Sequence, residues 1–248
     1  MKHLGLFEGI GGFSLAARWM GWETVAWVEI DPFCQKVLLK NFPDAKGHGD
    51  IREFDGNAYK GKIDILTGGF PCQPFSEAGK RKGDSDSRYL WDSMLQTINQ
   101  VKPTWVVAEN VFGLTTIERG LVFAKIETDM ENEGYEVQSF IIPSCSVNAP
   151  HKRDRVWIIA YAKGMGCKNG DAENIGKASN KINPPKNEGV FYTPKEWGDF
   201  ETVSVASQFF GNDDGLPNRV DRNMSLGNAI VPQVAYRIFE TINALNFG

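Results

Sequence analysis

One cysteine stands directly after an apolar run, at a place where packing does not require it. Residues 63–66 predict a short buried strand, and the pair of glycines at 68–69 ends it. Cys72 follows between Pro71 and Pro74, just past the strand, where parallel-sheet proteins place their chemistry. Free cysteine is commonly a buried packing residue, but a thiolate near positive charge or a helix N-terminus is a strong nucleophile. We therefore interpret Cys72 as a candidate nucleophile.

A carboxyl group ends another apolar run. Glu109, followed by Asn110 and Val111, comes after residues 104–108, which predict a second buried strand. Burial raises the pKa of an acid in so apolar a setting, so the acid can hold a proton near neutral pH and donate it. The alternative interpretation is an acid that caps the following turn.

Two arginines precede a third apolar run, at residues 156–162. Arg153 and Arg155 share one face of an extended chain, so both side chains can point into one site. Without the other motifs, a solvated charged turn would be the simpler interpretation of this segment.

A glycine-rich turn follows the opening strand. The segment FEGIGGF at 7–13 places Gly9, Gly11 and Gly12 before a predicted helix, where glycine lets the backbone turn tightly and approach a ligand. It is not the dinucleotide fingerprint GxGxxG, because Ser14 stands where the last glycine should be. A merely tight turn would explain these glycines nearly as well.

Two acids favour a ligand at this turn. Glu29 ends the next predicted strand about 20 residues on, which is typical of a carboxylate that accepts both hydroxyls of a ribose. Asp50 can lie at the end of a third strand and suits an exocyclic amine. A ribose acid without the pyrophosphate fingerprint indicates a nucleoside ligand that lacks phosphate, and S-adenosylmethionine fits that description.

The predicted elements alternate between strand and helix, which indicates a mostly parallel sheet covered on both faces. Strands are predicted at residues 4–7, 24–30, 63–68, 104–109 and 155–162. Helices are predicted at 13–21, 31–42, 89–101, 121–134 and 231–245, the last with Pro232 in its first turn. In the fourth of these, Leu121, Ile126 and Met130 are expected roughly on one face.

Composition limits the class of protein. The 248 residues fit one domain with room for a small second lobe, and 42% hydrophobic residues are enough for a core. The net charge of −4 argues against a wholly basic surface but allows a local basic groove. Four scattered cysteines and three histidines argue against a zinc site or disulfides and favour a reducing compartment. No apolar run approaches ~18 residues, so we expect a cytoplasmic protein without a membrane partner.

The composition changes near residue 163. From there to about residue 214 the chain is rich in Gly, Asn, Lys and Asp with scattered aromatic residues, and periodicity fades. A long surface insertion and a binding lobe are equally good interpretations of this composition.

Five motifs, in this order, resemble those of the DNA cytosine-5 methyltransferases: FxGxGG at 7–12, PCQ at 71–73, ENV at 109–111, RxR at 153–155 and GNA at 227–229. The segment at 214–222, followed by LGNAIVPQ at 226–233, resembles the ending of the compact phage and prophage versions of the family. PCQ and ENV at the ends of neighbouring strands are highly specific. The resemblance covers about residues 1–162 and 215–245. It implies the α/β S-adenosylmethionine-dependent methyltransferase fold, a mostly parallel seven-stranded sheet with one antiparallel strand, plus a small target-recognition lobe.

The resemblance also implies roles for parts of the chain. Residues 1–162 and 215–248 would form the catalytic domain, and 163–214 a short region that recognises double-stranded DNA. The residues implied in binding S-adenosyl-L-methionine are Phe7, Gly9, Gly11, Gly12, Glu29, Asp50, Pro71, Leu90, Asn228 and Ala229. Those implied in contacting DNA are Gln73, Ser76, Lys80, Arg81, Lys82 and Arg88. No metal is implied, and we expect a monomer.

The implied mechanism uses four catalytic residues. The Cys72 thiolate adds to C6 of a cytosine flipped out of the duplex. Protonated Glu109 takes up the charge that develops at N3, and Arg155, with Arg153, anchors the carbonyl oxygen of the base and its surroundings. C5 then takes the methyl group and loses its proton, and Cys72 leaves. The charged, glycine-containing loop after Cys72 is suited to close over DNA.

Some alternatives stay open. His151 stands where the family usually has glutamine, and the motif that supports the recognition lobe is not found. A tRNA cytosine-5 methyltransferase shares PCQ and ENV, and a catalytically silent DNA-binding protein would keep the fold. The short lobe and phage-like ending favour DNA, while the complete catalytic set favours an enzyme. The missing last glycine disfavours a nicotinamide-dependent dehydrogenase. A restriction partner, a phage-protection role and an orphan role are equally open.

Overall fold

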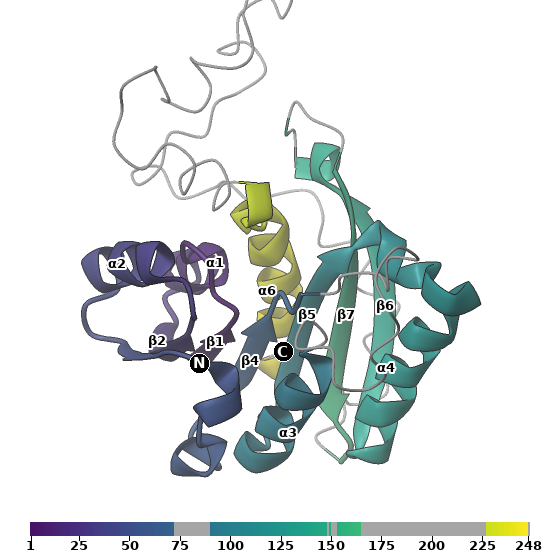
Figure 1. The fold of residues 1–248 in the computed structure, drawn as a ribbon, viewed down its shortest axis with the longest axis horizontal. Helices are drawn as coiled ribbons and strands as arrows, with labels where there is room; N and C mark the ends of the chain where they lie inside the picture. The colour runs from purple at the N-terminus through teal and green to yellow at the C-terminus, as the bar shows by residue number, and fades with distance from the viewer. Residues whose placement is uncertain (72–89, 148, 150–152, 165–226, 248) are drawn as a thin grey trace, which may run out of the picture.

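The computed structural model describes residues 1–71, 90–147, 149, 153–164 and 227–247, which contain a seven-stranded sheet with helices on both faces (Figure 1). The strands are β1 (Lys2–Leu6), β2 (Glu23–Val28), β3 (Lys46–His48), β4 (Ile65–Gly68), β5 (Trp105–Val111), β6 (Tyr135–Pro143) and β7 (Asp154–Ala162). Their order across the sheet is β3-β2-β1-β4-β5-β7-β6. Neighbouring strands are parallel except where β7 runs antiparallel to both β5 and β6. The predicted fold class is confirmed.

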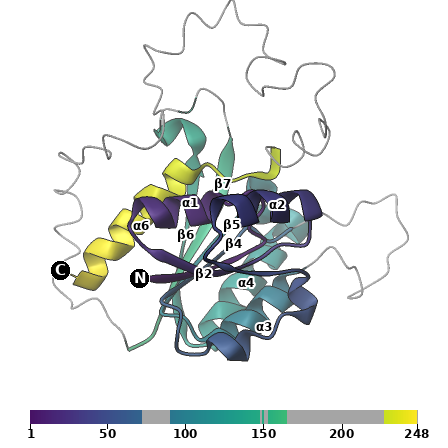
Figure 2. The same cartoon turned by 90° about the vertical axis from the view of Figure 1, so that its left-hand side faces the viewer.

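The α-helices of the described residues lie in two layers (Figure 2). They are α1 (Gly12–Trp19), α2 (Pro32–Asn41), α3 (Trp91–Val101), α4 (Leu121–Asn132) and α6 (Pro232–Phe247). Helices α1, α2 and α6 lie on one face of the sheet, and α3 and α4 lie on the other. Short 3-10 turns also occur, at Ile51–Glu53, Gly56–Tyr59, Phe112–Thr115, Ile117–Gly120 and Ser144–Val147. No helix of the described residues is long and apolar enough to cross a membrane.

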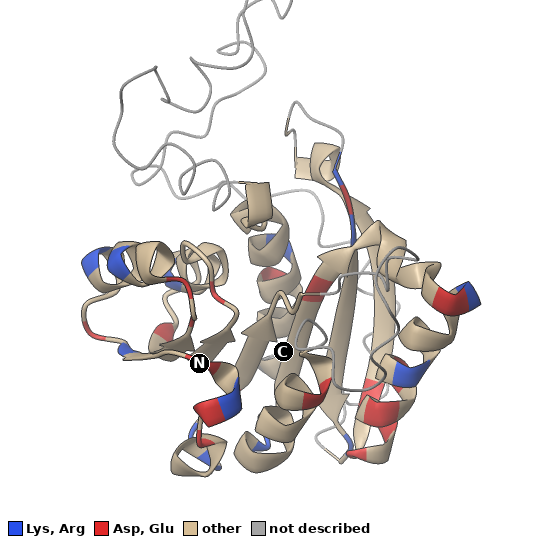
Figure 3. Cartoon of the chain, viewed as in Figure 1, with Lys and Arg blue, Asp and Glu red and all other residues tan. Residues whose placement is uncertain are grey.

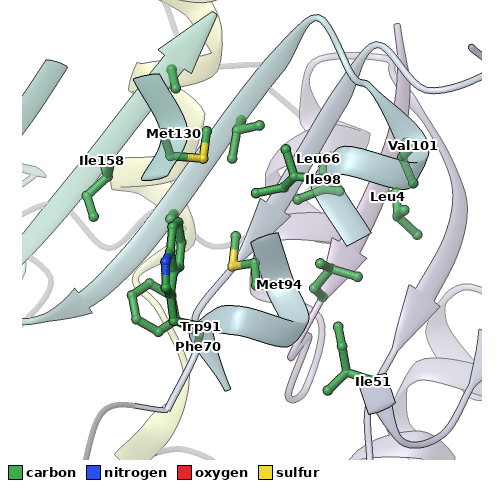
Figure 4. Packing of buried hydrophobic residues seen from close by; sticks show 14 of the residues in the cluster. Leu4, Ile51, Leu66, Phe70, Trp91, Met94, Ile98, Val101, Met130 and Ile158 are labelled. Atoms are coloured by element: carbon green, nitrogen blue, oxygen red, sulfur yellow. The ribbon is translucent and has the colours of Figure 1, made fainter. Parts of the chain in front are cut away.

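The larger part of the core lies between the sheet and helices α3 and α4 (Figure 4). Trp91, Met94, Ile98 and Val101 recur at helical spacing, so α3 turns one apolar face to the sheet, and each is at most 1% exposed. Burying a side chain of this size contributes about 1.5–3 kcal/mol. This packing fixes the start of α3, which follows the segment that contains Cys72.

A second core layer lies on the opposite face, where α1 and α6 pack together against the sheet. Phe13 of α1 meets Trp157 of β7 edge to face, with 6.0 Å between ring centroids. Trp22 stacks on Phe239 of α6 at 4.9 Å. Helix α6, the last in the chain, therefore forms one core layer together with α1, the first.

The predicted strands and helices are confirmed, with ends that differ by a few residues, but β6 was not predicted. Its side chains alternate between covered and exposed positions, and as the edge strand it has only one neighbour. The expectation for Leu121 is wrong: it is 68% exposed, whereas Ile126 and Met130 are buried. Five residues correspond to roughly 140° around a helix, so Leu121 and Ile126 do not share a face.

Candidate active site

The glycine-rich turn between β1 and α1 has three residues in the left-handed region. Phe7 has φ 51°, Gly9 has φ 57° and Gly11 has φ 95°. A Cβ on Gly9 would meet no atom within 4 Å, so this backbone faces open space. A Cβ on Gly11 would lie 2.6 Å from the Phe42 ring. Gly9 therefore has the open side that a ligand needs, while Gly11 is explained by backbone conformation and packing.

Close packing also explains why residue 12 is a glycine. A Cβ there would lie 2.5 Å from Cγ1 of Ile230, a residue that follows the GNA motif. The first motif of the chain thus packs against the residue that follows the last motif. The sequence predicted that all three glycines approach a cofactor, whereas the structure gives this open side to Gly9 among the three.

Glu29 holds the glycine-rich turn. It follows β2 directly and is 9% exposed. Its Oε2 accepts a hydrogen bond from the Gly9 N–H at 2.7 Å, and its Oε1 accepts one from the Asp31 N–H at 2.7 Å. Each carboxylate oxygen can accept a second hydrogen bond. Glu29 can therefore brace Gly9 and still accept hydroxyl groups of a ligand.

Ile30 is an exposed apolar residue at this edge that sequence reasoning did not single out. It lies between Glu29 and the N-cap of α2, Asp31, whose carboxylate accepts from the N–H groups of Phe33 and Cys34. Its apolar side chain is 62% exposed, beside the proposed ribose acid. The sequence pattern had included Ile30 as the last residue of the strand predicted at 24–30, whereas β2 ends at Val28.

Asp50 lies two residues beyond β3, as predicted, but its carboxylate is already occupied. The Arg52 guanidinium donates to both oxygens, and the Arg52 N–H donates to Oδ1 at 2.9 Å. These hydrogen bonds hold the pKa of Asp50 below its ordinary value. An exocyclic amine at this position would share the carboxylate with Arg52.

The other predicted cofactor residues lie at the same edge of the sheet, where the parallel strands end. Phe7 and Leu90 are half-buried and pack against the larger core cluster, while Pro71 and Asn228 are exposed. Ala229 follows Asn228, just before α6. The fold therefore brings the first, middle and last parts of the chain to one edge.

Phe70 fixes the backbone that leads to the candidate nucleophile. Its ring lies 5.2 Å from the Trp91 ring, and its carbonyl oxygen accepts a hydrogen bond from Nδ2 of Asn110 at 2.8 Å. Asn110, the middle residue of ENV, is buried, so this bond is shielded from water. Cys72 itself lies outside the described residues, two positions after Phe70. The role of Asn110 as a support for this segment was also missed by sequence reasoning.

Glu109 is a buried acid near the end of β5, two residues before its last residue, Val111. It is 7% exposed, and its Oε1 lies 2.9 Å from Nε of Arg155. Burial raises the pKa of Glu109, and the positive charges of Arg155 and Arg153 oppose this rise. A Cβ on Gly69 would lie 3.5 Å from its Oε2, so the carboxyl group adjoins the segment after β4. The arrangement suits a group that takes and gives a proton near PCQ.

The two arginines have different partners. Arg155 pairs with Glu109, and its Nη1 donates to the Asp154 carbonyl oxygen. Arg153 donates through Nη1 to the carbonyl oxygen of Gly227 and through Nη2 to that of Ala229, each at 2.8 Å. The structure thus brings Arg155 to Glu109 and Arg153 to the GNA motif.

A second buried acid was also missed. Glu8, in the glycine-rich turn, is 4% exposed, and burial raises its pKa from 4.5 to about 7. Its Oε1 accepts from the Ser14 N–H at 2.8 Å, while its Oε2 has no hydrogen-bond partner among the described residues. The bond to Ser14 joins the turn to the first residues of α1.

The residues predicted to contact DNA, Gln73, Ser76, Lys80, Arg81, Lys82 and Arg88, lie outside the described residues, as does nearly all of the predicted recognition region at 163–214. Among the described helices, α4 and α6 carry both acidic and basic side chains (Figure 3). Neither helix therefore carries charges of one sign only.

Comparison with known proteins identifies one family model and several related methyltransferases. The model of the C-5 cytosine-specific DNA methylase family matches residues 1–201. The Type II methyltransferase M.HhaI of Haemophilus parahaemolyticus is 32% identical over 170 residues, 68% of this chain and 51% of that protein. The orphan methyltransferase M.SPRI of Bacillus phage SPR is 33% identical over 170 residues, 66% of this chain and 38% of that protein.

Solved structures agree with these relatives. A DNA modification methyltransferase encoded within an Escherichia coli prophage has a TM-score of 0.57 at 25% identity, covering 69% of this chain and 49% of that one. DNMT2 of Spodoptera frugiperda has a TM-score of 0.58 at 26% identity, covering 67% and 51%. The chain spans about half the length of these proteins or less. With 201 of its 248 residues matched by the family model, the chain belongs to the C-5 cytosine-specific DNA methylase family.

Proposed function

We propose that this protein transfers a methyl group from S-adenosyl-L-methionine to C5 of cytosine in double-stranded DNA. The observation that carries the proposal is the position of Glu109: a buried acid with a raised pKa, paired with Arg155 and adjoining the segment that leads to Cys72. Family membership and the fold support the same activity.

The residues around the glycine-rich turn fit the cofactor. Gly9 leaves open space, Glu29 has hydrogen-bond capacity for ribose hydroxyls, and exposed Ile30 offers an apolar wall for the adenine ring. Asn228, at the far side of this edge, would contact the methionine end. The cofactor supplies an electrophilic methyl group on a sulfonium.

The catalytic residues would then make cytosine nucleophilic. We infer that the Cys72 thiolate adds to C6 of a flipped-out base, while protonated Glu109 binds N3 and takes up the developing charge. Arg155 would hold Glu109 and the carbonyl oxygen of the base. After C5 has taken the methyl group, loss of its proton lets Cys72 leave and restores the aromatic ring.

Recognition of the target would come from other parts of the chain. Residues 163–214 form the proposed target-recognition region, and the loop that follows Cys72 would contact the duplex. The relatives named above include a Type II enzyme and a phage orphan enzyme, so a restriction partner and a phage-protection role are both compatible proposals. We propose that the protein acts as a monomer.

The test is methyl transfer with labelled S-adenosyl-L-methionine on double-stranded DNA and, in parallel, on tRNA. Transfer to DNA, read at single sites by bisulfite sequencing, is the expected result. Transfer to tRNA alone would assign the RNA substrate instead. Duplexes with 5-fluorocytosine at the methylated site should give a covalent complex on denaturing gels, because fluorine cannot leave as a proton does. A methylated site that gives no adduct would contradict the role of Cys72.

A further inference from the structure

The side chain of Arg153, the residue directly before β7, bonds to both ends of the GNA segment, residues 227–229. Arg153 donates through Nη1 to the Gly227 carbonyl and through Nη2 to the Ala229 carbonyl, each at 2.8 Å. The planar guanidinium presents these two donors in a fixed fork, so it sets both the distance and the direction of the two carbonyl groups. Arg153 joins parts of the chain that are 74 and 76 residues apart.

A packing contact fixes the next residue. Cγ1 of Ile230 lies where a side chain on Gly12 would begin, 2.5 Å from an ideal Cβ at that glycine. Gly12 opens α1, directly after the glycine-rich turn. The segment is therefore fixed on one side by Arg153 and on the other by the start of α1.

Asn228 lies between the two carbonyl groups that Arg153 holds. It is exposed, so its side chain remains available to a ligand. Because the backbone is bonded on both sides of it, the directions open to its side chain are limited. A binding group held in this way loses little conformational freedom when it contacts a ligand.

We propose that Arg153 is a positioning residue for the cofactor: it holds Gly227 and Ala229 so that Asn228 faces the methionine end of S-adenosyl-L-methionine. This inference rests on the proposed function. It separates the two arginines of the RxR motif, because Arg155 serves the catalytic acid and Arg153 serves the cofactor side of the site. The sequence alone predicted one role, on the base, for both.

The experiment is isothermal titration of S-adenosyl-L-methionine into the full chain without DNA. Arg153→Ala should weaken binding roughly tenfold, because Asn228 and its backbone would then have to be ordered when the cofactor binds. The matched control, Arg155→Ala, should bind within about twofold of wild type, since among the described residues Arg155 bonds to Glu109 and Asp154 and not to the GNA segment. Equal affinities for wild type and Arg153→Ala would overturn the proposal.

A double-mutant cycle with Asn228→Ala separates positioning from a general loss of structure. If Arg153 acts through Asn228, Arg153→Ala should cost little further affinity once Asn228 has been replaced. Losses that simply add would overturn the proposal. Arg153→Lys keeps the charge but lacks the fork, so it should bind as weakly as Arg153→Ala, and full affinity would contradict the role of the fork. A wild-type protein that does not bind the cofactor at all would instead refute the proposed function.

Discussion

The two halves of the candidate site are built in different ways. Around the glycine-rich turn, backbone conformation and close packing determine which residue types fit. A side chain on Gly11 would collide with Phe42, and one on Gly12 would collide with Ile230. Around Glu109, electrostatics determine the protonation of the acid, because burial raises its pKa and the guanidinium of Arg155 opposes that rise. Substitutions in the first half should act on binding and stability, whereas those in the second should act on the chemical step.

Glu109→Gln should give the largest effect. The amide keeps the shape of the side chain but cannot carry a proton to N3, and loss of a general acid commonly costs about 10²–10⁴-fold in rate. Affinity for S-adenosyl-L-methionine should stay within about twofold, because Glu109 is proposed to contact the base and not the cofactor. Single-turnover methyl transfer and calorimetry measure the two quantities. A variant that loses both methyl transfer and affinity for the cofactor would contradict the separation between the Glu109 half and the cofactor half of the site.

Glu8→Gln tests the buried acid of the glycine-rich turn through pH. Burial raises the pKa of Glu8 from 4.5 to about 7, so between these values the folded protein binds a proton that the unfolded chain has lost. Wild type should therefore lose stability relative to Glu8→Gln as the pH rises from 5 to 8. The upper limit is about 3 kcal/mol, from 1.36 kcal/mol for each pKa unit.

Two neighbouring groups bear on this prediction. The charge of Glu29 adds to the rise in the pKa of Glu8, while burial lowers the pKa of His3 to about 3. His3 is therefore neutral in the folded protein over this range, and its own effect on stability cancels between wild type and variant. Chemical denaturation of both proteins at several pH values is the measurement. A difference in stability that does not change with pH would show that Glu8 keeps its ordinary pKa.

Glu29→Ala should act on the cofactor half alone. The carboxylate accepts from the Gly9 N–H and is proposed to accept from the ribose, so its loss should weaken cofactor binding by roughly 10- to 150-fold, or about 1.5–3 kcal/mol. Turnover at saturating cofactor should change much less. Calorimetry gives the dissociation constant, and an unchanged value would remove Glu29 from the cofactor site.

How far the sequence predicts this molecule depends on how local each feature is. Strands, helices and the positions of Glu29, Asp50 and Glu109 at strand ends follow from periodicity, and the structure agrees with them. Residue type also indicated that Glu109 would be buried and its pKa raised. These features are set by residues near each other in the chain.

Features set by distant contacts could not be predicted in this way. Nothing near Arg153 indicates that its partners lie 74 and 76 residues further on. The same holds for Gly12, whose missing side chain makes room for Ile230. The sequence pattern shows a glycine, but it does not show whether the space beside that glycine belongs to a ligand or to another part of the protein.

The smallest expected effect comes from comparing two glycines of the same turn. Gly9 and Gly11 both have positive φ, so alanine at either position should cost about 1–2 kcal/mol of stability through backbone strain. At Gly11 the new Cβ would also lie 2.6 Å from the Phe42 ring, whereas at Gly9 it would meet no protein atom within 4 Å. Gly11→Ala should therefore lower the free energy of unfolding more than Gly9→Ala, by about 1 kcal/mol or more for an overpacked site.

The affinity for the cofactor should rank the two variants in the opposite order, since the open space beside Gly9 is the space proposed for the ligand. Denaturant melts and calorimetry on both variants give the two rankings, and a Gly9→Ala protein with unchanged affinity would place the ligand away from this turn.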